Sequence, residues 1–533
     1  MALALIHTDT VFDSDHPLLE LQGAGGLTTF TVGGAIFLAA VGFDDDGLSV
    51  FAVGADGTLT NVDNVIDTPT FELHEAADVV AAEVGGTTYL FVGGRLDSGV
   101  SVFAVSADGS LTNVENIDDG DAGDLQLAGV LAVATATFGS QTYLFAGGGV
   151  DDGVSVFAVD ADGSLTNVDN VDDVDDVNYQ LDNINGISTA VVNGAVYLFA
   201  AGERDDGVSV FRVAPDGTLT NVDNVDDTAD AALELKGAVA VTTAMLGATT
   251  YLFVAGLIDD GVSVFEVGVD GTLTNVDNVD DTEDPNLELD GVGSLQTTVV
   301  DGVTYLFAAS FLDGGVSVFS VAEDGTLTNV ANVADDGDLA LAGATGVTIA
   351  MVDGVSHLFV AGSADDGVNV FRLQHNGVTL EGTNGGETLA GTEWDDTLLG
   401  KKGKDTLRGK AGDDLLDGGK HKDKLIGGDD ADTFRFSAGV KKKHADTIKD
   451  FEVGVDTIAL DSAVFAKLGG PGGLKSKFFD FGKAADSNQD RILYQAEKGW
   501  LRYDADGQGG TDAVKFIKLD KNLALSEDDF LVV

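Results

Sequence analysis

The chain of 533 residues contains no cysteine, so disulfide bonds and thiolate chemistry are excluded. No stretch approaches 18 consecutive apolar residues, and we therefore expect no transmembrane segment. The first ten residues, MALALIHTDT, lack both a basic start and a long apolar run. We therefore expect no N-terminal secretory signal.

Basic residues are scarce in the first part of the chain. Residues 1–378 hold five Lys and Arg against 61 Asp and Glu, a net charge of −56, whereas residues 379–533 hold 23 against 29, a net charge of −6. Such an acidic body repels nucleic acid and anionic membranes, so nucleic acid is excluded as a partner. It suits divalent cations or saline surroundings, although a heavily solvated surface explains most of these acids without any site.

Seven copies of a repeat of 52 to 54 residues fill the sequence up to about residue 378. In the fifth copy we predict strands at 238–246, 249–256, 262–267 and 272–279, because these runs are rich in Val, Thr, Phe and Tyr. Asp-Gly pairs mark the hairpin turns, since glycine takes positive φ without steric cost. Four antiparallel strands repeated seven times predict a seven-bladed β-propeller. The motif DDGVSVF and its variants mark the copies with Gly47, Gly99, Gly153, Gly207, Gly261, Gly315 and Gly367.

The two ends of this region predict how the ring closes. The last copy lacks the TLTNVDNV segment that supplies the fourth strand elsewhere, and the apolar segment Ala2–Thr8 precedes the first copy. We expect Ala2–Thr8 to pair as the outermost strand of the last blade, with Val378–Glu381 as the alternative.

The predicted innermost strands carry no catalytic pair. They offer threonines among Ala, Val and Gly, with Glu83 as a lone acid, whereas general acid–base catalysis needs a tunable pair within reach. The stretch His74–Asp78 approaches a zinc-protease helix motif but lacks the second His. Acid clusters such as Asp172-Asp173 suit calcium, but solvated turn and edge residues are the simpler explanation.

The blade pattern YLFVAG…GVSVF.V…DGTLT resembles the repeats of lactonase-type seven-bladed propellers over most of residues 20–372. The resemblance consists of core, turn and edge residues. It implies the fold and transfers no catalytic residue.

From Gly382 to Arg435 the sequence reads in six units of nine residues without a slip in register. Each unit opens with glycine, carries an acid at its sixth position and an apolar residue at its eighth. This pattern is typical of a calcium-binding parallel β-roll, with a flexible linker rich in Gly and Asp as the alternative. The acids are Glu387, Asp396, Asp405, Asp414, Asp423 and Asp432, and the apolar residues are Leu389, Leu398, Leu407, Leu416, Leu425 and Phe434.

This spacing predicts the calcium ligands. Glycines let backbone carbonyls face a cation, and the acids supply hard, charged oxygens. Two units make one coil, so Asp396, Asp414 and Asp432 form one file and Glu387, Asp405 and Asp423 the other. Trp394, His421 and Asp430 replace the fourth-position glycine, and lysines crowd several turns, where their charge opposes binding. We expect fewer sites than turns, with the best in the turns that hold Gly400, Gly403 and Asp405, and Gly409, Gly412 and Asp414.

The remainder of the chain resembles the segments that follow the roll in serralysin-type and other RTX proteins. The resemblance rests on ADTFRFSAG and ADTIKDFEVGVDTIAL within residues 431–460, and on residues 490–533, which end in Phe530-Leu531-Val532-Val533. It implies export by a type I secretion system that recognises an uncleaved C-terminal signal. The lack of cysteine and of an N-terminal signal agrees with that route.

We therefore predict an all-β protein with a propeller at 1–378, a β-roll at 379–436 and a β-rich export region at 437–533. We expect a secreted protein, extracellular or associated with the cell surface, whose calcium cofactor drives folding after export. The propeller is expected to bind an extracellular ligand or to be structural. Two alternatives stay open: a hydrolase of lactone or sugar-type substrates, and a protein that contacts minerals or polysaccharide through its acidic face.

Overall fold

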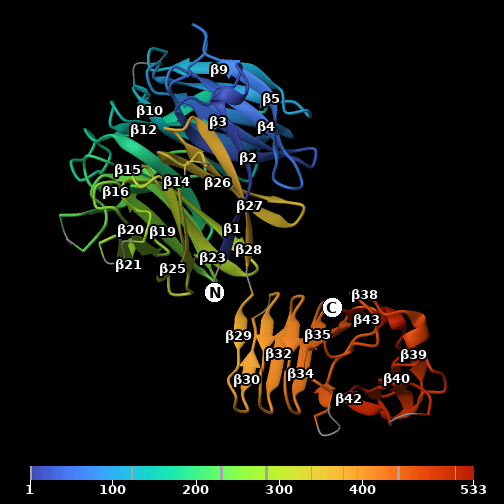
Figure 1. Ribbon diagram of the computed structural model, residues 1–533. Helices are drawn as coiled ribbons and strands as arrows, with labels where there is room; N and C mark the ends of the chain where they lie inside the picture. The colour runs from blue at the N-terminus through green and yellow to red at the C-terminus, as the bar shows by residue number, and fades with distance from the viewer. Residues whose placement is uncertain are drawn as a thin grey trace. The chain divides into compact units, whose positions relative to one another are not determined.

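The computed structural model describes residues 3–121, 124–228, 232–282, 286–335, 337, 339–375, 377–392, 394–440, 444–509 and 512–533. It is an all-β structure that divides into two compact units, Leu3–Gln374 and His375–Val533. In Figure 1 the first unit runs from blue to yellow and the second from orange to red. The helices in the described ranges are 3-10 turns of three residues: η1 (Asp13–Asp15), η2 (Ser476–Phe478), η3 (Ala496–Lys498) and η4 (Glu527–Asp529). Within those ranges no helix has the length and apolar character needed to cross a membrane.

The first unit is a seven-bladed β-propeller built from seven four-stranded antiparallel sheets. The innermost strands contact one another around a closed ring; they are β2 (Ala24–Val32), β6 (Ala76–Val84), β10 (Val130–Phe138), β14 (Ile184–Val192), β18 (Ala238–Leu246), β22 (Val292–Val300) and β26 (Ala344–Val352). The second strands are β3 (Ala35–Gly42), β7 (Thr87–Gly94), β11 (Gln141–Gly148), β15 (Ala195–Gly202), β19 (Thr249–Gly256), β23 (Val303–Ser310) and β27 (Val355–Gly362). The third strands are β4 (Gly47–Val53), β8 (Gly99–Val105), β12 (Gly153–Val159), β16 (Gly207–Val213), β20 (Gly261–Val267), β24 (Gly315–Val321) and β28 (Gly367–His375). The outer strands are β5 (Leu59–Ile66), β9 (Leu111–Asp118), β13 (Leu165–Asp172), β17 (Leu219–Asp226), β21 (Leu273–Asp280), β25 (Leu327–Ala334) and β1 (Leu3–Phe12).

The predicted strand pattern is confirmed. Strands β18 and β19 have the predicted bounds, β20 begins one residue earlier than predicted, and β21 is shifted by one residue at both ends. The second and third strands are buried along nearly their whole length because a neighbouring blade covers each face. This is why they read as continuous apolar runs instead of alternating apolar and polar residues.

Strand β1 closes the ring as expected. It pairs with β28 in the sheet of the last blade and extends to Phe12, four residues beyond the predicted end; Ala2 lies outside the described residues. The Oδ2 atom of Asp9 accepts the N–H of Leu59 in the first blade at 2.7 Å, as that of Asp63 accepts the N–H of Leu111 at 2.8 Å. The alternative segment pairs elsewhere, since β29 (Thr379–Glu381) belongs to the second unit.

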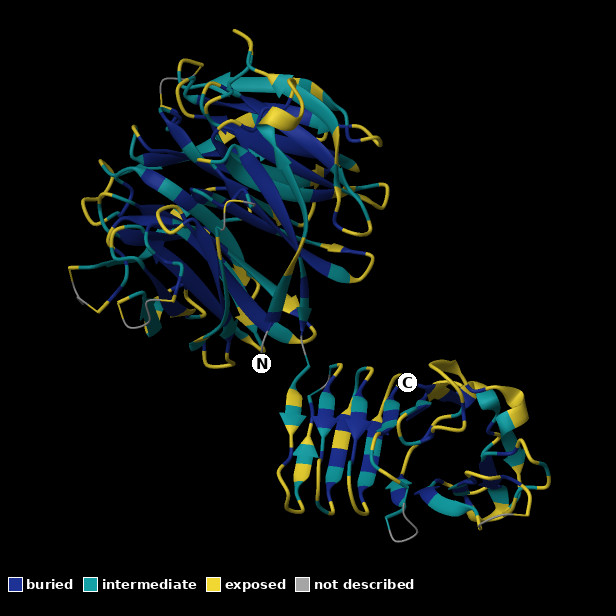
Figure 2. Cartoon of the chain, in the orientation of Figure 1, coloured by how far each residue is buried: buried dark blue, intermediate teal, exposed yellow. Residues whose placement is uncertain are grey.

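The second unit begins with a parallel β-roll. Its strands stack in two sheets with a repeat of 18 residues, so that Leu398 lies opposite Leu416 and Leu407 opposite Leu425. Of the predicted core residues, Leu398, Leu407, Leu416, Leu425 and Phe434 are fully buried, while Leu389 packs against them partly exposed. Figure 2 shows this burial within the strands and exposed residues at the turns.

Both sheets continue past the roll into the C-terminal part without a break. One sheet contains β29, β31 (Thr397–Leu399), β33 (Leu415–Asp417), β35 (Thr433–Phe436), β37 (Thr457–Leu460), β43 (Phe530–Val532) and β38 (Gly472–Gly473). The other contains β30 (Thr388–Ala390), β32 (Thr406–Lys410), β34 (Lys424–Gly428), β36 (Asp446–Ile448), β42 (Val514–Lys518), β41 (Trp500–Tyr503), β40 (Ile492–Gln495) and β39 (Phe479–Phe481). The end of the chain is part of this core, because Phe530 and Val532 are each 2% exposed.

Candidate calcium-binding site

The acids of the roll are held inside its turns. Five of them, Asp396, Asp405, Asp414, Asp423 and Asp432, are at most 2% exposed, because each directly precedes a strand whose apolar residue enters the core. Their Oδ1 atoms form a ladder with the coil before. Oδ1 of Asp414 accepts the N–H of Asp396 at 2.7 Å, and Oδ1 of Asp423 accepts that of Asp405 at 2.9 Å. One carboxylate oxygen of each acid is therefore committed to the backbone.

The second carboxylate oxygen has no such partner. Within the described ranges, the Oδ2 atoms of Asp405, Asp414, Asp423 and Asp432 are buried and accept no hydrogen bond. Asp396 differs, since its Oδ2 accepts the N–H of Thr392 at 2.5 Å. A buried charged oxygen without a partner opposes folding unless a cation compensates for it.

The first glycine of each unit provides the space that such a cation needs. A Cβ atom built on Gly409 would lie 1.7 Å from Oδ2 of Asp414 and 2.6 Å from the carbonyl oxygen of Gly427. One built on Gly400 would lie 2.9 Å from Oδ2 of Asp405 and 2.8 Å from the carbonyl oxygen of Gly418. Carboxylate and carbonyl oxygens thus approach the same space, and they are the hard ligands that calcium takes. The residues present fit calcium.

Electrostatics points the same way. Burial raises the pKa of Asp414 and Asp423 to about 7 and that of Asp432 to about 8, and neighbouring carboxylates of the same file add to each shift. The metal-free roll therefore resists ionisation of its own acids near neutral pH. A divalent cation would offset both the desolvation and the mutual repulsion.

The two files of acids lie in different charge environments. Asp414 lies near Asp395 and Asp413, whose charges contribute to its raised pKa. Asp405 and Asp423 instead line a surface depression together with Lys404, Lys422, Lys424 and Lys449. Ammonium groups oppose a cation, so the field favours calcium at the file of Asp396, Asp414 and Asp432.

The glycine replacements noted in the sequence have a backbone explanation. Four turns adopt positive φ at both the second and the fourth position of the unit, and each has glycine at only one of them. The pairs are Lys401 with Gly403, Lys410 with Gly412, Gly419 with His421, and Gly428 with Asp430. His421 and Asp430 therefore lie in turns whose glycine has moved to the second position. A non-glycine residue at positive φ carries strain, most of all Lys410 at a φ of 112°.

The ladder continues through acids that the nine-residue period missed. Oδ1 of Asp446 accepts the N–H of Asp423 at 2.8 Å, and Oδ1 of Asp456 accepts that of Asp432 at 3.1 Å. These steps span 23 and 24 residues instead of 18, because longer loops interrupt the coil. The detectable signal is the Asp-Thr-Ile sequence that begins with each of these two acids, which repeats the acid-x-apolar pattern of the nonapeptides.

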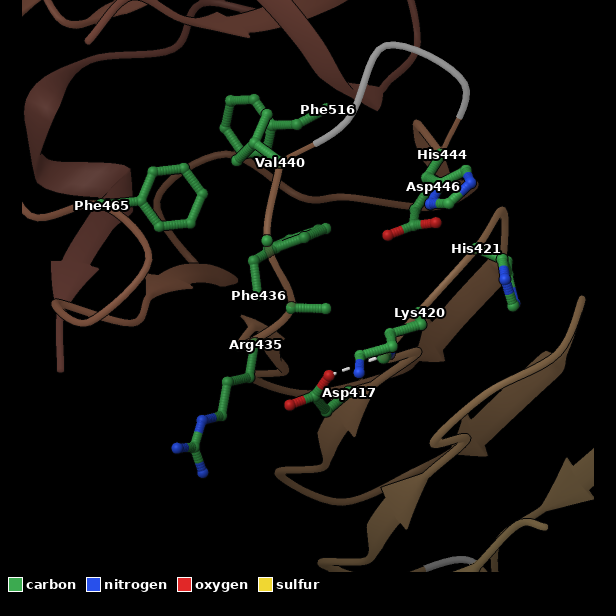
Figure 3. Close-up of a pocket in the computed structure, with 13 residues that line it drawn as sticks. Asp417, Lys420, His421, Arg435, Phe436, Val440, His444, Asp446, Phe465 and Phe516 are labelled. Carbon is green, nitrogen blue, oxygen red and sulfur yellow. Dashed lines mark hydrogen bonds between the residues drawn. The ribbon is translucent and has the colours of Figure 1, made fainter. Parts of the chain in front are cut away.

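A small pocket of about 90 Å³ lies where the roll meets the C-terminal part, with His421 and His444 on one side and Phe436, Phe465 and Phe516 on the other (Figure 3). The two imidazole rings contact each other with their centroids 4.9 Å apart. Lys420 and Arg435 also line the pocket. Arg435 is engaged by Asp461, whose Oδ2 lies 3.4 Å from its guanidinium nitrogen.

Two further features concern residues outside the roll. The carboxylates of Asp480, Asp486 and Asp490 approach within 4.8 Å of one another, although Asp490 already accepts the N–H groups of Asp486 and Ser487. The stretch His74–Asp78, which approaches a zinc-protease motif, leads into strand β6 and not into a helix.

The comparison with protein families agrees with the roll. The family model of the RTX calcium-binding nonapeptide repeat matches residues 381–409 and 399–434. No curated protein matches the chain. The chain is similar to a solved structure of a putative 6-phosphogluconolactonase from Bacteroides uniformis, at 18% identity, a TM-score of 0.44 and coverage of 66% of this chain and 96% of that one. It is also similar to the periplasmic gluconolactonase of Pseudomonas aeruginosa, at 18% identity, a TM-score of 0.43 and coverage of 58% and 85%. A protein from Lactobacillus plantarum is similar at 16% identity, with a TM-score of 0.42 and coverage of 56% and 81%. The chain thus joins a seven-bladed β-propeller to RTX calcium-binding nonapeptide repeats.

Proposed function

We propose that this is a secreted, calcium-dependent RTX protein whose roll folds when the exported chain meets extracellular calcium. The observation that carries the proposal is the row of buried Oδ2 atoms without hydrogen-bond partners. At low calcium these charges oppose folding. At millimolar calcium the binding energy becomes folding energy.

We assign the calcium ligands to the turns of the roll. The proposed ligand acids are Glu387, Asp396, Asp405, Asp414, Asp423 and Asp432, with carbonyl oxygens supplied by the turns that hold Gly400, Gly403, Gly409 and Gly412. The file of Asp396, Asp414 and Asp432 binds more tightly than the lysine-flanked file, and Asp456 extends it. Each bound ion supplies positive charge to oxygens of two successive coils and so stabilises their stacking.

We propose that the chain is exported by a type I secretion system first and folds with calcium afterwards. We propose a functional division into a propeller at 1–378, a roll at 379–436 and a C-terminal part at 437–533 that contains the export signal. Phe530 and Val532 are buried in the folded unit, so a signal within residues 490–533 is accessible only before folding. This supports export of the unfolded chain first and calcium-driven folding second.

The propeller is proposed to act outside the cell as a binding or structural module, with a polysaccharide or another surface ligand as its partner. The body's net charge of −56 disfavours anionic partners. The described residues that line the channel mouth include two carboxylates, Asp44 and Asp78, with no His, Lys or Arg, and give a lactone or sugar hydrolase no support.

The proposal is tested by following export and folding separately. Residues 379–533 fused to an unrelated, slowly folding cargo should direct that cargo out of a type I secretor, and deletion of residues 490–533 from the full chain should retain it in the cell. Full-yield secretion of the deleted chain would refute the export signal. Folding of the second unit in excess chelator, to the extent seen with calcium, would refute the role of calcium.

A further inference from the structure

A cavity of about 590 Å³ opens at one end of the propeller channel. Its walls come from the first residues of the innermost strands and from the turns that follow the second strands. The two meet because each innermost strand begins opposite the end of its neighbour, as Val130 does opposite Gly148. All seven blades therefore contribute to one cavity of a size that suits a small ligand.

Apolar side chains line the deep level of the cavity, and small residues line the level above it. Its deep level contains Leu27, Ile187, Val241, Leu295 and Val347. The level above contains the residue one position earlier in each strand, namely Gly26, Asp78, Ala132, Gly186, Ala240, Ser294 and Gly346. Six of these seven are small and uncharged, so Asp78 places one carboxylate in an otherwise neutral ring.

The blades differ from one another where they border this cavity. The third strands repeat almost the same sequence in every blade, whereas the residue after the second strand is Phe43, Arg95, Gly149, Glu203, Leu257, Phe311 or Ser363. The residue that follows it is apolar and exposed in several blades, with exposures of 51% for Leu96, 71% for Val150, 53% for Ile258 and 65% for Leu312. These four lie outside the lining of the cavity, where Phe43, Phe311 and Ser363 make the border differ from blade to blade.

Asp78 is fixed in place and has no cationic partner among the residues that the structure describes. Its Oδ1 accepts the N–H of Val79 at 2.8 Å and its Oδ2 accepts that of Val133 at 2.9 Å, which holds the carboxylate between two blades. Burial raises its pKa to about 6, so it is ionised at pH 7.5. The ion pairs of Arg95 with Glu75 and of Arg204 with Asp182 engage those two arginines with other acids.

We propose that this cavity binds a small amine with an apolar body, which places its ammonium group at Asp78 and its body on the apolar level beneath. This inference rests on the proposed role of the propeller as a binding module and names its ligand class. An ammonium ion matches the carboxylate of Asp78, and Asp44 adds a second carboxylate to the lining of the same cavity. Carboxylates and phosphates are excluded by the same group and by the charge of the unit.

The test uses the full chain at saturating calcium and pH 7.5, with binding measured by calorimetry. The probes are 2-naphthylmethylamine, its neutral counterpart 2-naphthalenemethanol and the anion 2-naphthoate. We expect the amine to bind at least tenfold more tightly than the alcohol, and 2-naphthoate not to bind. Asp78→Asn should reduce the affinity for the amine at least tenfold, to that of the alcohol. The matched control is Glu83→Gln, on the same strand but exposed, which should change nothing.

A second variant keeps the test decisive if Asp78→Asn does not fold. Ala240→Leu fills the middle level and should abolish binding of both the amine and the alcohol. Absence of amine binding to the native chain, equal binding of the three probes, or amine binding unchanged in both variants would overturn the proposal. Calcium-dependent tryptophan emission from the second unit is recorded in the same samples, so failure of the ligand class is distinguished from failure of calcium-driven folding.

Discussion

Replacement of Asp414 by Asn should have opposite effects on the roll with and without calcium. The amide retains an oxygen that can accept the N–H of Asp396, and it removes the charge from the buried Oδ2 position. The substitution therefore isolates the one oxygen that the fold leaves unpartnered.

The metal-free effect follows from the pKa. A folded-state pKa of about 7, against an ordinary value of 3.8, means that ionised Asp414 destabilises the metal-free roll at pH 8. The shift corresponds to roughly 4 kcal/mol, and solvent screening at a turn reduces it to about 1–2 kcal/mol. Asp414→Asn should raise metal-free stability by this amount at pH 8, and by less as the pH falls below 7, until the gain vanishes below about 3.8, where the native acid is protonated in both states.

The effect with calcium has the reverse sign. Loss of a charged ligand should raise the calcium concentration at half-folding at least tenfold, or about 1.4 kcal/mol. Asp423→Asn is the matched control, and its effect should be smaller because Lys422 and Lys424 already weaken that file.

Tryptophan emission measures both effects in the full chain, since Trp394 and Trp500 are its only tryptophans and both belong to the second unit. Calcium titrations give the holo effect. The folded fraction in chelator, with sucrose added to favour compact states, gives the metal-free effect. A loss of stability of equal size in calcium and in chelator would refute the reasoning, because Asp414 would then be only a hydrogen-bonding residue of the turn.

Three further predictions address the two units. Burial raises the pKa of Glu234 to about 7, so its charge destabilises the folded propeller increasingly between pH 4.5 and 7. Glu234→Gln, which copies Gln180 of another blade, should raise the melting temperature at pH 8 by about 2 °C and leave it unchanged near pH 4.5. An equal rise at both pH values would contradict an origin in the charge of Glu234. The Nε2 atom of His357 is fully buried and has no hydrogen-bond partner, whereas four other blades have at this position a tyrosine whose hydroxyl donates to a carbonyl 72 residues further on. The tyrosine hydroxyl of His357→Tyr should therefore donate to the carbonyl of Ala55 and stabilise the propeller by about 1 kcal/mol, measured by calorimetry. Destabilisation would show that the last blade has no room for the hydroxyl. Lys410→Gly removes both a residue strained at positive φ and an ammonium group, and should lower the calcium midpoint; a midpoint equal to that of the native chain would exclude both contributions.

In the proposed function, the acidic turns of the roll are stable only once calcium has bound. An aspartate ladder with Oδ1 bound to the backbone and Oδ2 unpartnered is a poor solution for a protein that must fold in the cytosol. It suits a chain that must remain unfolded until it has crossed a membrane. Phe530 and Val532 lie in the same buried core, so a proposed export signal that includes their side chains is accessible only before that core forms.

Repetition explains why so much of this fold could be predicted. The nine-residue register identified the buried leucines and the acids of the roll, because each position of a coil meets its own equivalent 18 residues later. The interval of about 54 residues identified the blades for the same reason, and the missing fourth strand of the last copy predicted that β1 closes the ring. In each case the decisive contacts join equivalent residues of successive repeats, so the period alone predicts which residues are in contact.

Only the tertiary structure decided what depends on contacts between non-equivalent residues. Asp446 and Asp456 join the ladder after loops that break the period, so spacing could not find them. The nine-residue units already placed Lys404 with Asp405, and Lys422 and Lys424 with Asp423, whereas only the stacked coils bring Lys449 to the same edge. Asp78 ends a stretch that only approaches a zinc-protease motif in the sequence, yet it faces a cavity whose other walls come from residues up to 286 positions away in the chain, such as Ala364. The sequence thus determined the repeating framework, and the closing of the ring and the stacking of the coils decided which oxygens lack partners and which carboxylate faces the cavity.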